Sequence, residues 1–529
     1  MAADPRHLVD LLDRLAARGE DAAFVRGGDA EHSGPRVARD ARALAAALLG
    51  AGLSPGDRVA IYLEKGPLAV VAIFACAAAG LVSVIVNPRL KDAQVRHILV
   101  DSGARLLLAS FDKMLLLQDA AGTVGEVPLV LTYADAGLAV PHRGMAELLA
   151  GPKGELPPVD PRAPATILYT SGSTGLPKGI VQDQRNLALG AAVVGRYLGL
   201  SAADHVLAVL PFSFDYGLNQ VLAAAWAGAR VTTLDYLGMA DVFTELRELR
   251  CTGLAGVPTF WREFASWLRK GEVRPETLRA LRYVTNSGGR LAVEDIRTLR
   301  KELPWVQVFS MYGLTEAFRS AFLPPSEVDR RPLSFGKPVE GVRLLVVDPE
   351  TGKAVARGEV GELVHAGAFV AHGYWNRPAD TARAFRAHPF DPQWPGRVVF
   401  SGDLVREDDE GFLYFVGRRD GQLKVSGYRV SPDEVEEALR GVSGVALAAV
   451  FGVPDESSGH RLIACVSPAP GAPADLAGHV LGSCRRLLPF YMVPAEVKVV
   501  REMPLNQNRK VDVPALRTQL GFAEGRGAS

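Results

Sequence analysis

The sequence is short of cysteine and carries no net charge. Its 529 residues hold four cysteines, Cys76, Cys251, Cys465 and Cys484, which lack the spacing of metal ligands. This pattern is typical of a reduced, intracellular protein rather than of a disulfide framework. Lysine plus arginine and aspartate plus glutamate both number 59, so the formal charge is zero. Because no basic stripe with interleaved aromatic residues occurs either, we expect no nucleic-acid binding.

The sequence also lacks an apolar signal core. Its start, "MAADPRHLVDLLDRLAARGE", is typical of a charged amphipathic helix, so we expect a cytoplasmic protein. One apolar run, residues 68–86, is long enough to cross a bilayer. It is largely alanine and is interrupted by Gly80 and Ser83, which favours a buried helix followed by a buried strand. We therefore expect no stable membrane insertion.

Internal repeats and low-complexity tracts are absent, and helix-like and strand-like stretches alternate instead. "DARALAAALLGAG" is followed by "DRVAIYL", and "DVFTELRELR" is followed by "TGLAGV". This alternation predicts an α/β fold with parallel-rich βαβ layers in a large N-terminal domain, residues 1–416. The proline-rich residues 151–165 are interpreted as a linker.

The pattern changes past residue 400. "GRVVFSGDLVREDDEGFLYFVGRRDG" predicts two strands, a turn and a third strand. A helix should begin at Ser431, and strands, a helix near 474–488 and a last strand "EVKVVRE" should follow. We predict a small, mobile α+β domain at residues 423–529, joined through a hinge at 417–422.

The segment "YTSGSTGLPKG", residues 169–179, has no side chains suited to a core. A strand-like "TILY" precedes it, and helix-like sequence follows after residue 185. Glycines let backbone N–H groups approach a ligand, and Lys178 adds one positive charge, which suits a polyphosphate. The spacing excludes the NTPase P-loop, the serine-hydrolase elbow and the dinucleotide-binding glycine motif.

Six segments in order resemble the AMP-forming adenylate synthetase superfamily, which includes acyl-CoA synthetases, peptide-synthetase adenylation domains and luciferases. Besides the glycine-rich loop, they are "NSGGRL" (286–291), "MYGLTEA" (311–317), "SGDL" (401–404), "GRRDGQLKVSGYRVSPDEVE" (417–436) and "PLNQNRKVDVPAL" (504–516). The resemblance covers nearly the whole chain and implies ATP, Mg²⁺ and a thiol, either CoA or the phosphopantetheine of a carrier protein.

The resemblance also implies site residues. It assigns ATP and AMP binding to Thr170, Ser171, Gly172, Ser173, Thr174, Gly175, Lys178, Gly288, Gly289, Tyr312, Asp403, Arg418 and Arg429. Tyr312 would lie against adenine and Asp403 would accept from both ribose hydroxyls. The implied catalytic residues are Thr315 on phosphate, Glu316 on Mg²⁺ and Lys510 between the acid and the α-phosphate. An aromatic face suits a base, and a hard cation prefers carboxylate oxygen.

In the hinge segment, the resemblance makes Asp420 the pivot of domain rotation. It places Lys424 and Gly427 on the side that receives the thiol. Arg509 stands where the family usually has glycine before the lysine.

The acid pocket is implied at Phe214, Asp215 and Gly313. Amino-acid adenylation domains have such an aspartate, which binds the substrate ammonium, but Tyr216 is bulky where they have a small residue. Asp215 could equally cap a helix that starts near Tyr216. At the position of Leu314, amino-acid enzymes usually have proline, whereas acyl-CoA ligases have leucine as this chain does.

The implied function is activation of a small carboxylic acid as acyl-AMP, with pyrophosphate release and acyl transfer to a thiol. The chain looks nearest to stand-alone acyl-CoA ligases of biosynthetic clusters, so CoA is the expected acceptor, with an acyl carrier protein as the other choice. Amino-acid adenylation with carrier loading is the alternative. An inactive adenylate-binding protein is a further one, and nothing in the sequence favours luciferase-type oxidation over a thioester.

Overall fold

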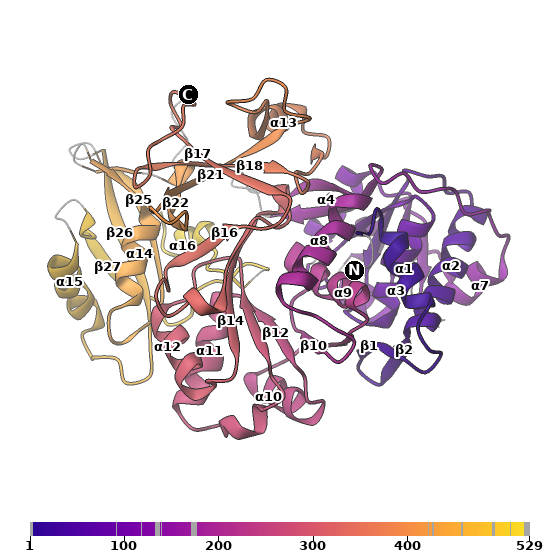
Figure 1. Cartoon of the computed structure of the whole chain (residues 1–529), viewed down its shortest axis with the longest axis horizontal. Helices are drawn as coiled ribbons and strands as arrows, with labels where there is room; N and C mark the ends of the chain where they lie inside the picture. Colours follow the sequence, from indigo (N-terminus) through magenta and orange to yellow (C-terminus); the bar gives the residue numbers. More distant parts are fainter. Residues whose placement is uncertain are drawn as a thin grey trace. The chain divides into compact units, whose positions relative to one another are not determined.

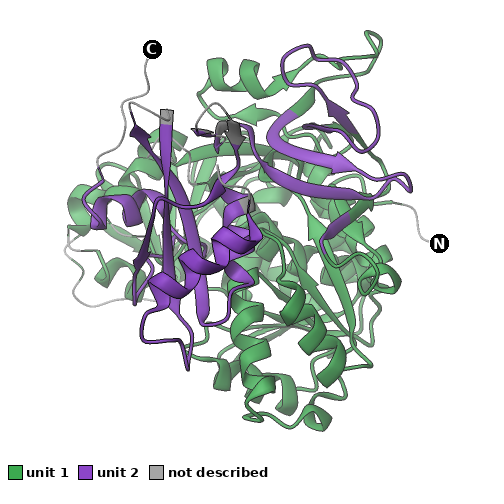
Figure 2. Cartoon of the chain, turned by 90° about the vertical axis from the view of Figure 1, so that its left-hand side faces the viewer, with its two compact units in different colours: residues 1–332, 336–344, 365–399 green, residues 333–335, 345–364, 400–529 purple. Residues whose placement is uncertain are grey.

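The computed structural model describes residues 4–90, 92–117, 119–132, 138, 140–170, 177–421, 423–425, 428–455, 459–488, 492–507 and 509–522. Contacts within the chain divide it into two compact units (Figure 2). Unit 1 comprises Met1–Pro332, Gly336–Leu344 and His365–Val399. Unit 2 comprises Leu333–Phe335, Leu345–Val364 and Phe400–Ser529.

The first sheet of unit 1 has the strand order β19-β9-β8-β4-β3-β5-β6-β7. Its strands are β3 (Arg58–Tyr62), β4 (Val82–Ile85), β5 (Leu106–Ala109), β6 (Leu129–Leu131), β7 (His142–Gly144), β8 (Pro164–Thr170), β9 (Lys178–Asp183) and β19 (Gly373–Tyr374). The run from β8 to β7 is parallel, whereas β8, β9 and β19 pair antiparallel. The sheet therefore ends in an antiparallel edge, and the two strands that flank the glycine-rich loop, β8 and β9, belong to that edge.

The strands of the second sheet that belong wholly or partly to unit 1 include a run with the order β16-β15-β14-β13-β12-β10-β11-β1-β2, which is part of a longer sheet. Its strands are β1 (Ala23–Gly27), β2 (Ala30–Ser33), β10 (His205–Ala208), β11 (Arg230–Thr233), β12 (Gly253–Gly256), β13 (Tyr283–Asn286), β14 (Gln307–Tyr312), β15 (Ala321–Leu323) and β16 (Ser334–Pro338). From β14 to β1 the strands are parallel, as the alternating sequence predicted. A short strand, β20 (Phe385–Arg386), pairs with Val398 and Val399.

Helices cover these sheets (Figure 1). They are α1 (Leu8–Ala16), α2 (Gly34–Gly50), α3 (Pro67–Ala78), α4 (Asp92–Ser102), α5 (Phe111–Leu115), α6 (Ala120–Val124), α7 (Met145–Ala150), α8 (Gln184–Tyr197), α9 (Asp215–Ala227), α10 (Met239–Glu248), α11 (Pro258–Arg269), α12 (Val293–Glu302), α13 (Pro378–Ala384), and the 3-10 turns η1 (Pro275–Leu278), η2 (Thr315–Ala317) and η3 (Pro325–Glu327). The largest buried apolar cluster joins α1, α2, α3, α8 and α9 to strands of both sheets. These helices therefore form the core between the sheets.

The apolar run at residues 68–86 folds as the sequence predicted. It forms buried α3 and buried β4, and Gly80, with φ of +68°, turns the chain between them. A positive φ is readily adopted by glycine, which has no Cβ. In the described part of the chain, no helix has the length and apolar character needed to span a bilayer.

Unit 2 has an α+β structure of its own. Its elements are β17 (Val342–Val347), β18 (Val360–Gly367), β21 (Val398–Glu407), β22 (Leu413–Arg418), η4 (Arg419–Gly421), β23 (Leu423–Val425), β24 (Tyr428–Val430), α14 (Pro432–Arg440), β25 (Val445–Asp455), β26 (Gly459–Pro468), α15 (Leu476–Leu487), β27 (Glu496–Val499) and α16 (Val513–Gln519), some of which begin or end in unit 1. The order β24-β23-β26-β25, with β27 on β26, makes its own sheet. Buried side chains of α14 and α15 pack with this sheet in one cluster.

The mixed α/β architecture with a large sheet unit and a smaller unit confirms the predicted fold class. One local prediction was wrong: residues 398–407 form one ten-residue strand, β21, rather than two strands. Strand β9, between the glycine-rich loop and α8, was not predicted from the sequence. Contacts place residues 400–416 in unit 2, so the hinge at 417–422 stays a prediction.

Candidate active site

The glycine-rich loop connects two antiparallel strands. Thr170 at the end of β8 faces Lys178 at the start of β9, and Tyr169 faces Gly179. The predicted phosphate-binding residues Ser171, Gly172, Ser173, Thr174 and Gly175 lie outside the described residues. The hairpin nevertheless fixes where the loop leaves and re-enters the sheet. Lys178 therefore lies where the chain re-enters the sheet after the loop, opposite the residue at which it leaves.

Lys178 forms an ion pair in unit 1. Its Nζ lies 2.8 Å from Oδ2 of Asp380 and 5.8 Å from the centre of the Tyr374 ring. The hydrogen bond from Lys178 lowers the pKa of the Asp380 carboxyl. Both side chains are only partly buried, so this pair is one that a stronger anion could displace.

Glu316 lies beside the same tyrosine. The hydroxyl of Tyr374 donates to Oε1 of Glu316 at 2.6 Å. Tyr374 belongs to β19, which pairs with β9 so that Tyr374 faces Ile180. Strand pairing thus brings Lys178 and Glu316 to one aromatic side chain. Tyr374 was not predicted as a site residue, and its only signal in the sequence is "GYW" at 373–375.

Thr315 is buried at the start of η2, and its carbonyl accepts from Nε2 of Gln182. Oε1 of Gln182 accepts in turn from Nδ2 of Asn186 at 3.3 Å. The backbone N–H of Ala371 donates to the carbonyl of Glu316 at 2.9 Å. Buried amides therefore fix the backbone that carries Thr315 and Glu316.

The strands that carry the predicted adenine residues lie side by side. In parallel register, Asn286 of β13 faces Ser310 of β14, so "NSGGRL" and "MYGLTEA" follow at the same edge of the sheet. Gly288 has φ of +79°, and Nδ2 of Asn286 donates to the carbonyl of Gly289 at 2.9 Å. The Asn286 side chain therefore holds the turn at Gly288 and Gly289 against the end of β13.

Tyr312 ends β14 with one face near a buried histidine. Its ring lies 5.8 Å from that of His365, at an interplanar angle of 20°. Burial lowers the pKa of His365 to about 3, and its Nδ1 contacts Oγ of Ser320 at 2.8 Å. His365 is therefore neutral near pH 7, which leaves an uncharged aromatic layer beside Tyr312.

Asp403 and Arg418 meet within unit 2. They face each other across β21 and β22, and Nη1 of Arg418 donates to Oδ1 of Asp403 at 2.6 Å. Asp403 is buried, whereas half of the Arg418 side chain is exposed. Oγ of Ser401 accepts from the Asp403 N–H at 3.0 Å. The two predicted ribose residues are thus neighbours in the structure.

Lys510 is exposed on a tight turn closed by the bridge between Leu505 and Val511. Its N–H donates to Oδ1 of Asn506 at 3.1 Å. Arg509 has φ of +58°, a left-handed conformation that favours glycine. Arg509 therefore occupies a backbone conformation that glycine adopts more readily.

The hinge segment is described in part. Arg419 donates to buried Glu362 at 2.9 Å within unit 2. The side chains of Asp420, Lys424 and Arg429 and the whole of Gly427 lie outside the described residues. In backbone register, Lys424 of β23 faces Arg429 of β24.

In the predicted acid pocket, Asp215 does not have the helix-capping role that the sequence left open. Helix α9 begins at Asp215, and its N-cap is Phe214, so Asp215 does not cap it. Its Oδ2 instead accepts from Nη1 of Arg319 at 3.3 Å, and both side chains are about 4% exposed. A Cβ on Gly313 would lie 3.1 Å from the Phe318 carbonyl oxygen, so glycine permits this close approach. Sequence reasoning missed Arg319.

A magnesium site built only from protein is absent: no group of three His, Cys, Asp or Glu residues in the described part of the chain could hold a metal ion. Mg²⁺ usually takes one or two carboxylates and completes its shell with water and substrate phosphates. A single carboxylate at Glu316 therefore fits Mg²⁺ that arrives with a nucleotide.

The profile of AMP-binding enzymes matches residues 12–375, and that of the AMP-binding enzyme C-terminal domain matches residues 434–510. The chain belongs to the AMP-binding enzyme family. The match confirms the resemblance to AMP-forming adenylate synthetases that the six sequence motifs indicated.

Relatives of this AMP-binding enzyme differ in acceptor and in length. The chain is 31% identical to sulfoacetate–CoA ligase of Cupriavidus necator, over 95% of this chain and 96% of that protein. It is 32% identical to L-proline–[L-prolyl-carrier protein] ligase of Streptomyces coelicolor, over 94% of each. It also matches a plipastatin synthase polypeptide of Bacillus subtilis at 32% identity over 97% of this chain, but spans only 14% of that protein.

A solved structure shows the same fold. o-Succinylbenzoate CoA synthetase of Bacillus subtilis, in complex with an acyl-adenylate intermediate, has a TM-score of 0.80 and 25% identity. The alignment covers 97% of this chain and 98% of that one. The AMP-binding enzyme described here is therefore similar both to CoA ligases and to carrier-protein ligases.

Proposed function

We propose that the protein activates a carboxylic acid as acyl-AMP with release of pyrophosphate and then transfers the acyl group to CoA. The protein is an AMP-forming acid–thiol ligase. The observation that carries the proposal is the convergence of Lys178 and Glu316 on Tyr374, at the mouth of the glycine-rich loop. One cation and one carboxylate at that place suit a nucleotide that carries magnesium.

The first half-reaction joins two anions, so the difficulty is electrostatic. The attacking carboxylate oxygen forms a bond to the α-phosphorus of ATP, and the bond to pyrophosphate breaks. A carboxylate is already a nucleophile, so no general base is needed. Catalysis then depends on positioning and on neutralising charge.

Residues of this chain supply those two effects in the proposal. Lys178 leaves Asp380 and binds the outer phosphates together with the glycine-rich loop. Glu316, oriented by Tyr374, would hold Mg²⁺, which would neutralise phosphate charge. Lys510 bridges the acid and the α-phosphate. Asp403 accepts from the ribose hydroxyls, and Tyr312 lies against adenine.

The second half-reaction needs a path for the thiol and no longer needs Lys510. We propose that the segment at 417–422 turns the C-terminal residues between the two steps, with Asp420 as the pivot. Lys424 and Gly427 would then lie on the thiol side. Asp420→Pro should stop thioester formation and leave ATP–pyrophosphate exchange, whereas equal loss of both would contradict the hinge.

The single test of the adenylation role is ATP–pyrophosphate exchange with Lys510→Ala. Removal of a preorganised cationic donor should lower exchange about 10²–10³-fold, while ATP binding by the large unit persists. Lys498→Ala, which removes a lysine paired with Glu496, is the matched control. Wild-type protein that binds ATP but gives no exchange with any acid would instead identify an inactive adenylate-binding protein.

Amino-acid activation with loading of a carrier protein is the second candidate. The retained Asp215 and the similarity to a prolyl-carrier ligase favour it. The ion pair with Arg319 weighs against it, because the carboxylate already has a cationic partner and needs no substrate ammonium. Thioester formation assayed with free CoA and with a phosphopantetheinylated carrier protein separates the two.

A further inference from the structure

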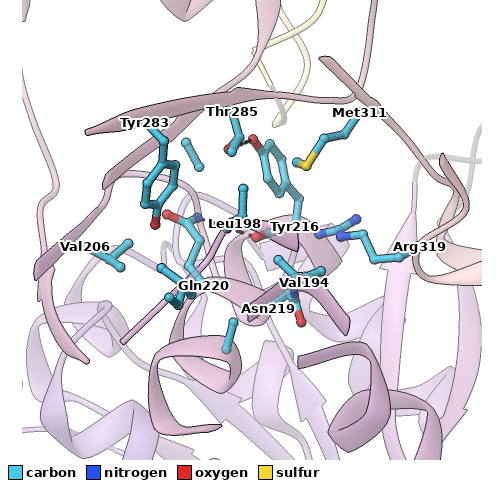
Figure 3. A pocket seen from close by; sticks show the side chains of 13 residues that line it. Val194, Leu198, Val206, Tyr216, Asn219, Gln220, Tyr283, Thr285, Met311 and Arg319 are labelled. Atoms are coloured by element: carbon cyan, nitrogen blue, oxygen red, sulfur yellow. Dashed lines mark hydrogen bonds between the residues drawn. The ribbon is translucent and has the colours of Figure 1, made fainter. Parts of the chain in front are cut away.

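A small cavity lies inside unit 1 beside helix α9 (Figure 3). Its volume is about 20 Å³, little more than a water molecule needs. Its polar lining comes from Tyr216, Asn219 and Gln220 of α9, Tyr283 and Thr285 of β13, and Arg319. The hydroxyl of Tyr216 is hydrogen-bonded to Thr285, which closes one wall. Any group larger than water, a carboxylate as well as an alkyl chain, enters this cavity only if lining side chains move, and a long chain would need the largest movement.

Arg319 presents an unused edge there. Its Nη1 is engaged by Asp215 at 3.3 Å and by the Phe318 carbonyl at 3.0 Å. No acceptor among the described residues reaches Nε or Nη2 of Arg319, although the side chain is buried. These two donors share one edge of the guanidinium, where they form a fork that matches a group with two oxygen atoms.

The guanidinium is held in place. Its Cζ lies 5.0 Å from the centre of the Tyr216 ring and 5.3 Å from that of Phe318. Figure 3 shows it pointing toward Tyr216, from the segment that follows β14. Burial of a donor without an acceptor is unfavourable, so a fixed pair of such donors suits a ligand that accepts from both.

Two carboxamides lie on the same cavity. Among described residues, Oδ1 of Asn219 and Oε1 of Gln220 have no donor within hydrogen-bonding distance, and both atoms are buried. A carboxamide turned about its last bond presents NH₂ in place of oxygen. The lining can therefore add donors beside the fork.

We propose that the acid activated by this enzyme is short and carries a second group with two oxygen acceptors, a carboxylate or a sulfonate, which binds the free edge of Arg319. The second group takes no part in bond making, and its role is recognition. Asp215 balances the arginine charge on its other edge. This inference rests on the proposed function, because it concerns the acid that the adenylation step consumes.

The test is ATP–pyrophosphate exchange with matched acids of three to six carbons. Each unsubstituted acid is compared with its ω-carboxylate, ω-sulfonate, ω-hydroxyl and ω-amino counterpart, as butyrate is compared with succinate. We expect kcat/KM for the ω-carboxylate or the ω-sulfonate to exceed that of the unsubstituted acid by at least about 10²-fold, because a site with buried donors rejects a substrate that leaves them unpaired.

Arg319→Met should then reduce this selectivity ratio at least about 30-fold, which would support the assignment. Arg269→Met is the matched control, since it also removes an arginine paired with a buried carboxylate, Asp295, and should keep the ratio. If Arg319→Met fails to fold, the double variant Asp215→Asn/Arg319→Met, which leaves no unpaired charge, provides the measurement.

The outcomes are distinguishable. Equal activation of substituted and unsubstituted acids, preference for the ω-hydroxyl or ω-amino acid, or a ratio that Arg319→Met does not change would overturn the substrate inference and leave adenylation standing. Absence of exchange with every acid, while ATP binds, would overturn the proposed function and the inference together.

Discussion

The hydroxyl of Tyr374 donates to the Glu316 carboxylate at 2.6 Å, and the two residues are 58 positions apart in the chain. The same ring lies 5.8 Å from the Lys178 ammonium. Tyr374 therefore orients the carboxylate proposed for Mg²⁺ and contacts the lysine proposed for phosphate. A residue outside every recognised motif links two that lie inside them.

Tyr374→Phe should weaken the use of magnesium. The variant keeps the ring beside Lys178 but removes the donor that orients Glu316. Loss of a hydrogen bond behind a metal ligand typically lowers metal affinity about 10–100-fold. Exchange measured across a Mg²⁺ titration should show a higher half-saturating concentration, with activity recovered at high Mg²⁺.

Tyr414→Phe is the control for that experiment. Tyr414 also donates from its hydroxyl to a carboxylate, Oδ2 of Asp408, at 3.0 Å, but in unit 2. Its loss should not change the Mg²⁺ dependence. A loss of activity in Tyr374→Phe that no Mg²⁺ concentration restores would contradict the orienting role.

Asp380→Asn should improve ATP binding. In the structure Asp380 competes for the lysine that we assign to phosphate. A partly exposed pair contributes only about 0.2–1 kcal/mol, so KM for ATP should fall no more than about fivefold. Lys178→Ala should raise KM for ATP instead. A higher KM in Asp380→Asn would show that the pair assists nucleotide binding.

Arg509 tests the turn that carries Lys510. Its φ of +58° costs a non-glycine residue about 1–2 kcal/mol, and Arg509→Gly removes that strain while adding freedom to the unfolded chain. We expect thermal stability near that of the wild type and exchange within about threefold. Arg509→Val should lower both, because a β-branched residue tolerates a positive φ poorly. Equal activity of the two variants would mean that the turn geometry does not matter.

Sequence patterns predicted the elements whose cause is local. The alanine-rich run became α3 and β4 because burial on all sides needs no alternation. The positive φ of Arg509 was not predicted from the sequence. Contacts between distant segments were missed. Asp215 and Arg319 are 104 positions apart, and nothing local distinguishes a carboxylate that caps a helix from one that meets an arginine across the core.

The pH dependence of stability should reveal His365. Its pKa is lowered from 6.5 to about 3 by burial, whereas in the unfolded chain it titrates near 6.5. The unfolded state therefore binds the proton first as the pH falls, and the native state loses stability between pH 6.5 and 3 by up to about 1.4 kcal/mol per pH unit. Above pH 6.5 this contribution is fully present. Urea unfolding at pH 7.5, 6 and 5 should show a shallower decline in His365→Gln, which cannot take up that proton. The same decline in both proteins would mean that His365 is accessible to protonation in the native state, and that the layer beside Tyr312 is not held uncharged.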